Sequence, residues 1–340
     1  MQKVSFGATG LKVSKVALGC MSFGSPDWRA WVLDKTISTR MLGRALEAGI
    51  NFFDTANVYS SGESERILGA FLRGAAPRDE VVVATKCFYD NGLPPNLTGL
   101  SRANVIGSLD ASLQRLGLDY VDIYQVHRWD DVTPIDETMQ AMADVVKAGK
   151  ARFVGASNMR TWHLAKAQLS SQRIGFRGYA AMQNHYNLLY REDERDLIPF
   201  CRDQGLGLMC WSPLARGRLG RAGTTDATSR AGLDDVATTL YGPPTDPILN
   251  VLAKIARSRD LPPAQVALAW VMAQGIIPIA GVTKDRHLED AIASASLVLS
   301  ADELDRLDKA YTSRPLSELP WSSKSIRDPR ELAAMLSGKR

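Results

Sequence analysis

Short apolar runs alternate with amphipathic segments along most of the chain. The runs are four to seven residues long and most contain Val, Ile or Phe, which is typical of strands buried in a parallel sheet. The predicted strands are Val16–Gly19, Asn51–Asp54, Val81–Lys86, Val121–His127, Ala151–Ala156, Ala180–Asn184, Leu206–Trp211 and Ile276–Ala280.

The segments between these runs carry apolar residues at helical spacing. Ser101 can cap one helix, Thr133-Pro134 can open the next, and Gly49 and Gly117 stand where two helices should stop. Eight strand–helix pairs in this order predict an α/β fold, a (β/α)8 TIM barrel. The predicted helices are Thr39–Ala48, Ser64–Leu72, Arg102–Leu116, Ile135–Lys147, Thr161–Leu169, Glu192–Gln204, Pro263–Gln274 and Arg286–Ala295.

Three segments stand outside this alternation. Val4 and Val13 flank a Gly-containing turn, which predicts an N-terminal β-hairpin before the barrel. Residues 213–245 form a long stretch rich in Gly, Arg and Thr, typical of a functional lid or a disordered loop. A last helix is expected at Ala301–Tyr311. We therefore assign residues 1–316 to the barrel and residues 317–340 to a C-terminal tail, an extension of the fold.

Ionisable side chains follow three successive predicted strands. Asp54 ends the second strand, with Tyr59 five residues later, and Lys86 and His127 end the third and fourth. Parallel strands place these ends on one face of a barrel, where enzymes of this fold keep their catalytic residues. Singly, Asp54 could cap a helix and Tyr59 could be a packing residue. Together, the four groups predict an active site.

The types of these four residues favour proton transfer to an oxygen. An ammonium near a phenol stabilises phenolate, so we expect Lys86 to lower the pKa of Tyr59 while Asp54 orients Lys86. His127 could bind the same substrate oxygen or relay a proton to Tyr59. Such a group suits protonation of an alkoxide formed from a carbonyl. Acyl transfer is disfavoured because no Ser or Cys nucleophile is paired with a base, and a catalytic metal is disfavoured because only one of the four residues is a His.

Composition excludes several classes of partner. The net charge is only +4 over 340 residues and no Lys/Arg block is present, so we expect no nucleic acid and no anionic membrane as a partner. The four cysteines show no metal-ligand spacing, and no signal-peptide pattern or bilayer-spanning apolar run occurs. We expect a cytoplasmic protein, and the sequence leaves homo-oligomerisation open.

Several motifs together resemble one enzyme family over roughly residues 1–312. They are Leu18-Gly-Cys-Met-Ser-Phe-Gly24, Gly49-Ile-Asn-Phe-Phe-Asp-Thr-Ala56 with Tyr59, Gly62-Glu-Ser-Glu65, Lys86, His127, Lys150-Ala-Arg-Phe-Val-Gly-Ala-Ser-Asn158, Gln183 and Trp211-Ser-Pro-Leu-Ala-Arg-Gly-Arg218. The chain resembles the aldo-keto reductases, in particular the bacterial branch that is also similar to the β subunits of potassium channels. The resemblance implies NADPH-dependent reduction of a small-molecule carbonyl, with Asp54, Tyr59, Lys86 and His127 as the catalytic tetrad.

The resemblance also implies a set of cofactor contacts. Ser157 and Asn158 match the pair that holds the nicotinamide carboxamide, Gln183 matches a second amide partner, and Trp211 matches an aromatic ring stacked on the nicotinamide. Trp211 and Gln183 could instead be core residues. The remaining expected contacts near the nicotinamide and the pyrophosphate are Cys20, Met21, Asp54, Ser212, Pro213, Leu214, Arg216 and Arg218.

The stretch Gly281–His287 matches the family's site for the adenosine phosphate. Gly281, Thr283, Lys284 and His287 are the implied contacts, and a helix start there would favour phosphate. His287 stands where related sequences carry Arg or Gln, and many have Asn at Ala291. Lys284, with Arg286 and Arg218, still favours NADP(H) over NAD. No GxGxxG motif follows a strand, which argues against a Rossmann site.

Substrate contacts and the physiological role stay open at this stage. Aromatic residues in the predicted loops around the barrel mouth could line a substrate wall or simply cover the barrel: Trp28, Trp31, Phe88, Tyr89 and Trp129. Besides carbonyl reduction, two other roles are compatible with the sequence. One is a nicotinamide-binding regulatory or redox-sensor subunit, and the other is a dehydrogenase that oxidises a sugar or alcohol.

Overall fold

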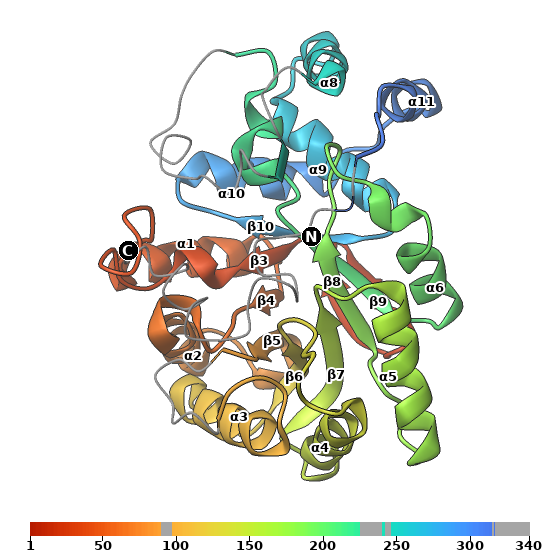
Figure 1. The fold of residues 1–340 in the computed structure, drawn as a ribbon. Coiled ribbons are helices and arrows are strands. Elements are labelled where there is room, and N and C mark those ends of the chain that lie inside the picture. The colour runs from red at the N-terminus through yellow and green to blue at the C-terminus, as the bar shows by residue number, and fades with distance from the viewer. Residues whose placement is uncertain (90–96, 225–239, 242–245, 315, 317–340) are drawn as a thin grey trace.

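The computed structural model describes residues 1–89, 97–224, 240–241, 246–314 and 316. Its centre is a closed barrel of parallel strands in the order β10-β3-β4-β5-β6-β7-β8-β9 (Figure 1). The eight predicted strands are all confirmed, each within one residue at both ends. They are β3 (Ala17–Gly19), β4 (Phe52–Asp54), β5 (Val82–Cys87), β6 (Val121–Val126), β7 (Ala151–Ser157), β8 (Ala181–His185), β9 (Gly207–Trp211) and β10 (Ile277–Gly281).

Helices surround the barrel, as the predicted TIM-barrel fold requires (Figure 1). Two of them, α8 and α11, lie outside the main ring, where α8 packs on α9 and α11 packs on α8. The described helices are α1 (Lys35–Glu47), α2 (Glu63–Ala75), α3 (Arg102–Leu116), α4 (Ile135–Lys147), α5 (Thr161–Arg173), α6 (Leu197–Asp203), α8 (Pro247–Ser258), α9 (Pro263–Ala273), α10 (Asp285–Ser294) and α11 (Ala301–Lys309).

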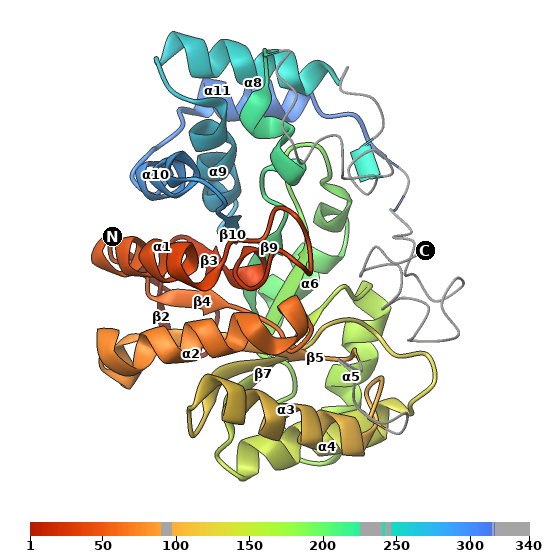
Figure 2. The ribbon, with the colours of Figure 1, turned by 90° about the vertical axis from the view of Figure 1, so that its left-hand side faces the viewer.

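The predicted N-terminal hairpin closes one end of the barrel. Strands β1 (Lys3–Ser5) and β2 (Lys12–Ser14) pair antiparallel with Val4 opposite Val13, at the end where the barrel strands begin (Figure 2). The hairpin places Phe6 against Phe52 in an edge-to-face contact with ring centroids 5.5 Å apart. A Cβ at Gly207 would lie 2.5 Å from the Phe6 ring, so β9 needs glycine there. The carboxyl ends of the barrel strands lie at the opposite end.

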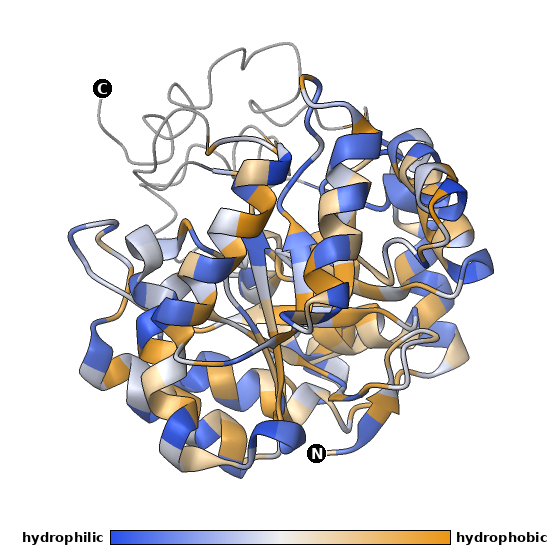
Figure 3. Ribbon diagram, turned by 90° about the horizontal axis from the view of Figure 1, so that it is seen from below, coloured by the Kyte–Doolittle hydropathy of each residue, from blue (hydrophilic) through white to orange (hydrophobic). Residues whose placement is uncertain are grey.

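Apolar side chains fill the barrel and the layer between strands and helices. In Figure 3, hydrophobic residues concentrate on the central strands and on the helix faces turned toward them. The barrel interior near the hairpin is lined by Phe6, Val13, Ala17, Phe52, Val82, Ala84, Ile123, Ala181, Met209, Ile277 and Ile279. This packed interior gives the strand ends at the other side a rigid support.

Some helix predictions were wrong in position. The predicted helix Glu192–Gln204 is a short 3-10 turn at Glu192–Glu194 followed by α6, because Asp196 leaves the helical conformation (φ −149°). Helix α1 starts four residues earlier than predicted, where Asp34 caps it by accepting a hydrogen bond from the Ile37 amide.

Helix α8 was not predicted at all. It follows Asp246, which caps it, and Pro247, which starts it, and it buries Ile248, Leu252 and Ile255. These residues lie between the long segment 213–245 and the predicted helix Pro263–Gln274, and they were assigned to neither.

Two predicted segments lie partly or wholly outside the described residues: 225–239 and 242–245 of the long loop, and all of the tail 317–340. The predicted lid and the role of the tail therefore stay predictions. Among the residues that the structure does describe, none of the helices combines the length and apolar character needed to cross a bilayer.

Candidate active site

The predicted tetrad meets at the carboxyl ends of three neighbouring strands. Asp54 is the last residue of β4, Lys86 lies near the end of β5, and His127 directly follows β6. Tyr59 opens the 3-10 turn Tyr59–Gly62 after β4. Lys86 Nζ donates to Asp54 Oδ1 at 2.5 Å, to the Thr55 carbonyl oxygen at 2.9 Å and to the Tyr59 hydroxyl at 3.4 Å.

The Asp54–Lys86 pair is enclosed and its hydrogen bonds are satisfied. The side chains of Lys86 and Asp54 are 0% and 3% exposed. Asp54 Oδ2 accepts from Gln183 Nε2 at 2.9 Å and from Gln125 Nε2 at 3.1 Å. A buried ion pair is tolerated only with such complete hydrogen bonding. Gln125 was not predicted from the sequence. It lies two residues after Ile123 in β6, and this spacing places both side chains on the inner face of the strand.

The charges of this cluster shift the pKa values of both Lys86 and Tyr59. Burial is the largest cause and lowers the pKa of Lys86, but Asp54 and Tyr59 together outweigh burial and the net shift is upward. For Tyr59, burial raises the pKa, Lys86 lowers it and Asp54 raises it, and the net shift is upward. The expected lowering of the Tyr59 pKa by Lys86 is therefore present, but burial outweighs it. At neutral pH, Lys86 is an ammonium and Tyr59 a neutral phenol.

His127 completes the cluster as a neutral imidazole. Burial lowers its pKa well below the usual value, and Lys86 and Arg128 lower it further. Its ring lies edge-on to Tyr59, with centroids 5.8 Å apart, and to Tyr89, with centroids 5.1 Å apart. Nδ1 is buried without a hydrogen-bond partner in the described part of the chain. A neutral imidazole at this position can hold a substrate oxygen but carries no positive charge.

Asn158 ties three strand ends together beside this cluster. It has a left-handed backbone (φ +52°) just after β7. Its Nδ2 donates to the His127 carbonyl oxygen and to Ser157 Oγ, both at 2.9 Å. Its Oδ1 accepts from Trp211 Nε1 at 3.0 Å. The structure thus brings together Ser157, Asn158 and Trp211. The family resemblance had assigned all three residues to the nicotinamide end of the cofactor.

Trp211 belongs to a three-ring stack that the sequence did not predict. The His185 ring is parallel to Trp211 on one side (4.4 Å, 11°) and to Tyr190 on the other (4.5 Å, 13°). His185 Nε2 lies 2.5 Å from the hydroxyl of buried Tyr241, 56 residues away in sequence. The stack fixes the plane of the half-buried Trp211 ring.

The predicted pyrophosphate segment begins directly after β9 with an unusual backbone. Ser212, Ala215 and Arg216 all have positive φ (52°, 48° and 55°), which costs energy in residues other than glycine and occurs often at ligand sites. Asn187 Nδ2 holds this turn by donating to the Ser212 carbonyl oxygen at 2.9 Å. The other predicted contacts of this segment are buried Pro213 and half-buried Leu214 and Arg218.

The ends of β3 and β10 lie side by side, as the predicted contacts require. Ser22 Oγ donates to the Val282 carbonyl oxygen at 2.7 Å, next to buried Cys20 and half-buried Met21. Burial raises the pKa of the Cys20 thiol strongly, so it is no nucleophile at neutral pH.

The stretch after β10 is open and basic. Gly281 is exposed, and a Cβ there would meet nothing within 4 Å. Thr283 Oγ1 lies 3.3 Å from His287 Nδ1, and exposed Lys284 immediately precedes α10. Open space, a cation and a helix start suit a phosphate. Together with the Trp211 ring, the strand-end amides and the arginines after β9, these residues fit a nicotinamide dinucleotide.

The five predicted substrate contacts divide into two groups. Tyr89 packs on His127, and Phe88 packs on Tyr89 at 5.2 Å. The three tryptophans have other ring partners: Trp28 and Trp31 pair with each other at 6.5 Å, and Trp129 stacks on His163 of α5 at 4.2 Å.

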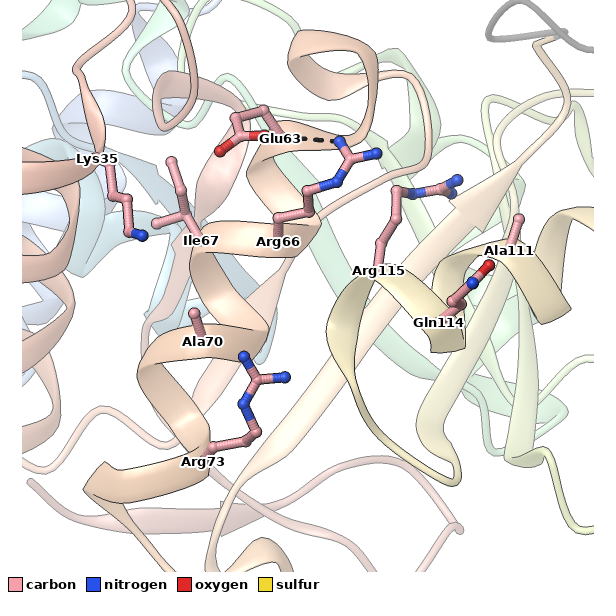
Figure 4. A pocket seen from close by; sticks show the side chains of 9 residues that line it. All are labelled: Lys35, Glu63, Arg66, Ile67, Ala70, Arg73, Ala111, Gln114 and Arg115. Atoms are coloured by element: carbon pink, nitrogen blue, oxygen red, sulfur yellow. Dashed lines mark ion pairs between the residues drawn. The ribbon is translucent and has the colours of Figure 1, made fainter.

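Two hollows of the described surface lie away from the tetrad. One, of about 580 Å³, is formed between α1, α2 and α3 by residues that include Lys35, Arg66, Arg73 and Arg115 (Figure 4). The other, of about 410 Å³, lies at the hairpin end beside Phe6. No tetrad residue lines either hollow. We therefore locate the candidate site by its strand-end chemistry, which follows the rule for this fold, and not by cavity size.

Comparison with known proteins identifies the family of the chain. The model of the Aldo/keto reductase family matches residues 15–312. The chain belongs to this family of NAD(P)H-dependent oxidoreductases, which act on carbonyl and alcohol groups.

Individual relatives match over nearly their whole lengths. The chain is 38% identical to versiconal hemiacetal acetate reductase of Aspergillus parasiticus, over 93% of this chain and 98% of the relative. It is 39% identical to an aldo-keto reductase of Alternaria alternata, over 91% of each chain. It is 38% identical to a provisionally named aryl-alcohol dehydrogenase of Schizosaccharomyces pombe, over 91% of this chain and 95% of the relative.

Proposed function

We propose that this protein reduces aldehyde or ketone groups with NADPH and that Tyr59 donates the proton. The observation that carries the proposal is the position of Lys86 Nζ, which contacts both the Asp54 carboxylate and the Tyr59 hydroxyl at the strand ends. This arrangement pairs a proton donor with a fixed positive charge, as protonation of a forming alkoxide requires.

Each tetrad residue has a distinct part in this proposal. A reduced nicotinamide, when bound, supplies a hydride to the carbonyl carbon. Tyr59 then gives its proton to the carbonyl oxygen, since its raised pKa keeps it protonated at neutral pH. Lys86 stabilises the phenolate left behind, and Asp54 keeps Lys86 charged and in place. Neutral His127 holds the same oxygen by a hydrogen bond.

The proposed cofactor contacts lie at or after the ends of β8, β9 and β10. Gln183 Nε2 is engaged by Asp54, which leaves Oε1 to accept from a carboxamide N–H. Trp211 would offer its ring to the nicotinamide, and Arg216 and Arg218 would meet the pyrophosphate through charge-assisted hydrogen bonds. Exposed Lys284 supports NADPH over NADH, because only NADPH carries a 2′-phosphate.

Oxidation of an alcohol is a second candidate, favoured by the relative named as an aryl-alcohol dehydrogenase. The same residues would serve, but Tyr59 would have to accept a proton as phenolate. Because its pKa is raised, oxidation would gain from high pH and reduction would not. The proposed setting is the cytoplasm, with a small carbonyl compound as partner. The buried free thiols of Cys20, Cys87, Cys201 and Cys210 support a reducing compartment.

The test removes the Tyr59 hydroxyl and keeps the ring. Tyr59→Phe should lower NADPH-dependent aldehyde reduction by about 10²–10⁴-fold, the usual contribution of a positioned general acid. NADPH binding, followed by quenching of tryptophan fluorescence, should change little. Tyr120→Phe is the matched control, since Tyr120 precedes β6 at the far end of the barrel and bonds to Arg152. Turnover of Tyr59→Phe within tenfold of wild type would reject Tyr59 as the donor.

A further inference from the structure

Arg128 is a buried cation with no partner for two of its nitrogens. The residue is only 8% exposed, and its Nε and Nη1 are enclosed without a hydrogen-bond partner in the described chain. The nearest acidic residues in sequence are engaged elsewhere. Asp130 Oδ2 accepts from the Leu100 amide, and Asp131 Oδ1 accepts from Trp129 Nε1. No carboxylate of the described residues forms an ion pair with Arg128.

A buried guanidinium without an anion is costly. Buried charges in folded proteins are normally paired, and buried polar groups are normally hydrogen-bonded. Arg128 has the Tyr89 side chain as a hydrogen-bonding neighbour but no anion among the described residues, so its charge calls for an anion from outside the chain. Nη2 is the one guanidinium nitrogen that is not among the enclosed, unpartnered atoms, so an anion would offset the charge of Arg128 through this nitrogen. Guanidinium groups select carboxylates and phosphates by charge and geometry.

Arg128 lies beside the proposed catalytic residues, at the end of β6. It directly follows His127, and its guanidinium carbon lies 5.3 Å from the centre of the Phe88 ring. Its charge is close enough to lower the pKa values of both His127 and Tyr89, although burial leaves Tyr89 with a raised pKa of about 12. The rings of Tyr89 and Tyr59 both contact the His127 imidazole. Arg128 and the proton donor Tyr59 therefore lie in the same cluster of side chains.

Keeping His127 neutral does not explain Arg128. Burial is the largest cause of the low pKa of His127 and Lys86 is the second, so the imidazole would stay neutral without Arg128. Phe88 and Tyr89 provide ring surface in the same cluster, which suits a ligand with a flat apolar body and an anionic end.

We propose that Arg128 binds a carboxylate of the substrate, so that the preferred substrates are aldehydes or ketones that carry a carboxylate on an aromatic or similarly flat body. This inference rests on the proposed carbonyl reduction, whose Tyr59 and His127 would hold the carbonyl oxygen while Arg128 holds the other end. A carboxylate is favoured over a bulkier phosphate because so little of the guanidinium is exposed.

A pair of aldehydes that differ only in charge tests the proposal. Wild type should have a kcat/KM at least tenfold higher for 4-carboxybenzaldehyde than for its methyl ester. The ester is the more electrophilic aldehyde, so intrinsic reactivity works against this outcome. Arg128→Met should lose about 10–100-fold on the acid, the value of one charge-assisted hydrogen bond, and stay within about threefold on the ester. Arg128→Lys should keep part of the preference because it retains the charge.

Stability separates ligand binding from a structural role. A buried unpartnered charge destabilises the fold, so Arg128→Met should melt at the same temperature as wild type or higher. A melting temperature several degrees lower would mean that Arg128 supports the fold and would overturn the proposal. So would equal losses on both aldehydes, or a wild type with no preference for the acid.

Binding without turnover separates this inference from the proposed function. Benzoate should raise the melting temperature of the wild-type full-length chain but not of Arg128→Met, whereas neutral benzamide should affect neither. If benzoate acts in this way and neither aldehyde is reduced, the anion subsite stands and the proposed function fails. If aldehydes are reduced and benzoate stabilises both proteins equally, the proposed function stands and the subsite fails.

Discussion

At the scale of single residues, the site depends on one enclosed ion pair. Asp54 and Lys86 are almost fully buried. Asp54 also accepts hydrogen bonds from Gln125 and Gln183, and Lys86 also donates to the Thr55 carbonyl oxygen. Such a pair contributes little net stability as a unit, but removing one member leaves the other uncompensated. Its value is the fixed positive charge beside Tyr59.

This asymmetry predicts a rescue. Lys86→Met should lower the unfolding free energy by about 3–5 kcal/mol, because the Asp54 carboxylate stays buried without its cation. The double variant Asp54→Asn, Lys86→Met should regain most of that loss. Neither variant should reduce aldehydes, because the charge beside Tyr59 is gone from both. Urea unfolding of the three proteins is the measurement. A double variant no more stable than Lys86→Met would show that the pair is not coupled as its geometry indicates.

At the scale of elements, close packing of α2 on α3 depends on a glycine. A Cβ on Gly69 of α2 would lie 1.9 Å from the Leu116 carbonyl oxygen at the end of α3. This oxygen is part of the backbone of α3, so it cannot move aside as the end of a flexible side chain could. Glycine therefore sets the distance between these two helices.

Gly69→Ala should therefore destabilise the protein by about 1–3 kcal/mol, the usual result of overpacking. Gly74 in the same helix is the matched control, since a Cβ there would meet nothing within 4 Å. Gly74→Ala should stabilise the protein by up to about 1 kcal/mol through helix propensity alone. Melting curves of both variants decide the matter. Equal shifts in the two would mean that α2 and α3 can move apart at no cost.

Local patterns predicted the elements and the tetrad. Apolar runs gave the barrel, and the ends of parallel strands necessarily share a face, which placed Asp54, Lys86 and His127 together. The resemblance to a family supplied the candidates for the cofactor. None of this required knowing which side chains meet across the fold.

Contacts between distant segments escaped prediction. His185 stacks between Trp211 and Tyr190 and bonds to Tyr241, and no local pattern marks such partners. Burial was equally hidden. It reverses the expected pKa shift of Tyr59 and makes Arg128 unusual, and both depend on how loops cover the strand ends.

At the scale of the whole molecule, the histidines make the fold sensitive to acid. Burial lowers the pKa of His185 to about 3 and of half-buried His163 to about 4, and lowers that of His127 well below its usual value. Below pH 6.5 the unfolded chain binds protons at these residues and the folded chain does not. The stability of the fold therefore decreases as the pH is lowered. Asp193 acts in the opposite sense, because burial raises its pKa to about 7 and the folded chain takes up its proton first.

His185 allows this effect to be isolated. Between pH 7 and pH 5, a histidine locked in the neutral form costs the fold about 2 kcal/mol of stability. His185→Phe keeps a ring between Trp211 and Tyr190 and removes the titrating group, at the expense of the hydrogen bond to Tyr241. That lost bond lowers stability at every pH alike. The loss of unfolding free energy from pH 7 to pH 5, measured by urea titration, should therefore be about 2 kcal/mol smaller in the variant than in wild type. Equal losses in the two proteins would mean that His185 is protonated in the folded state at pH 5, and the stack beneath Trp211 would then be a cationic one.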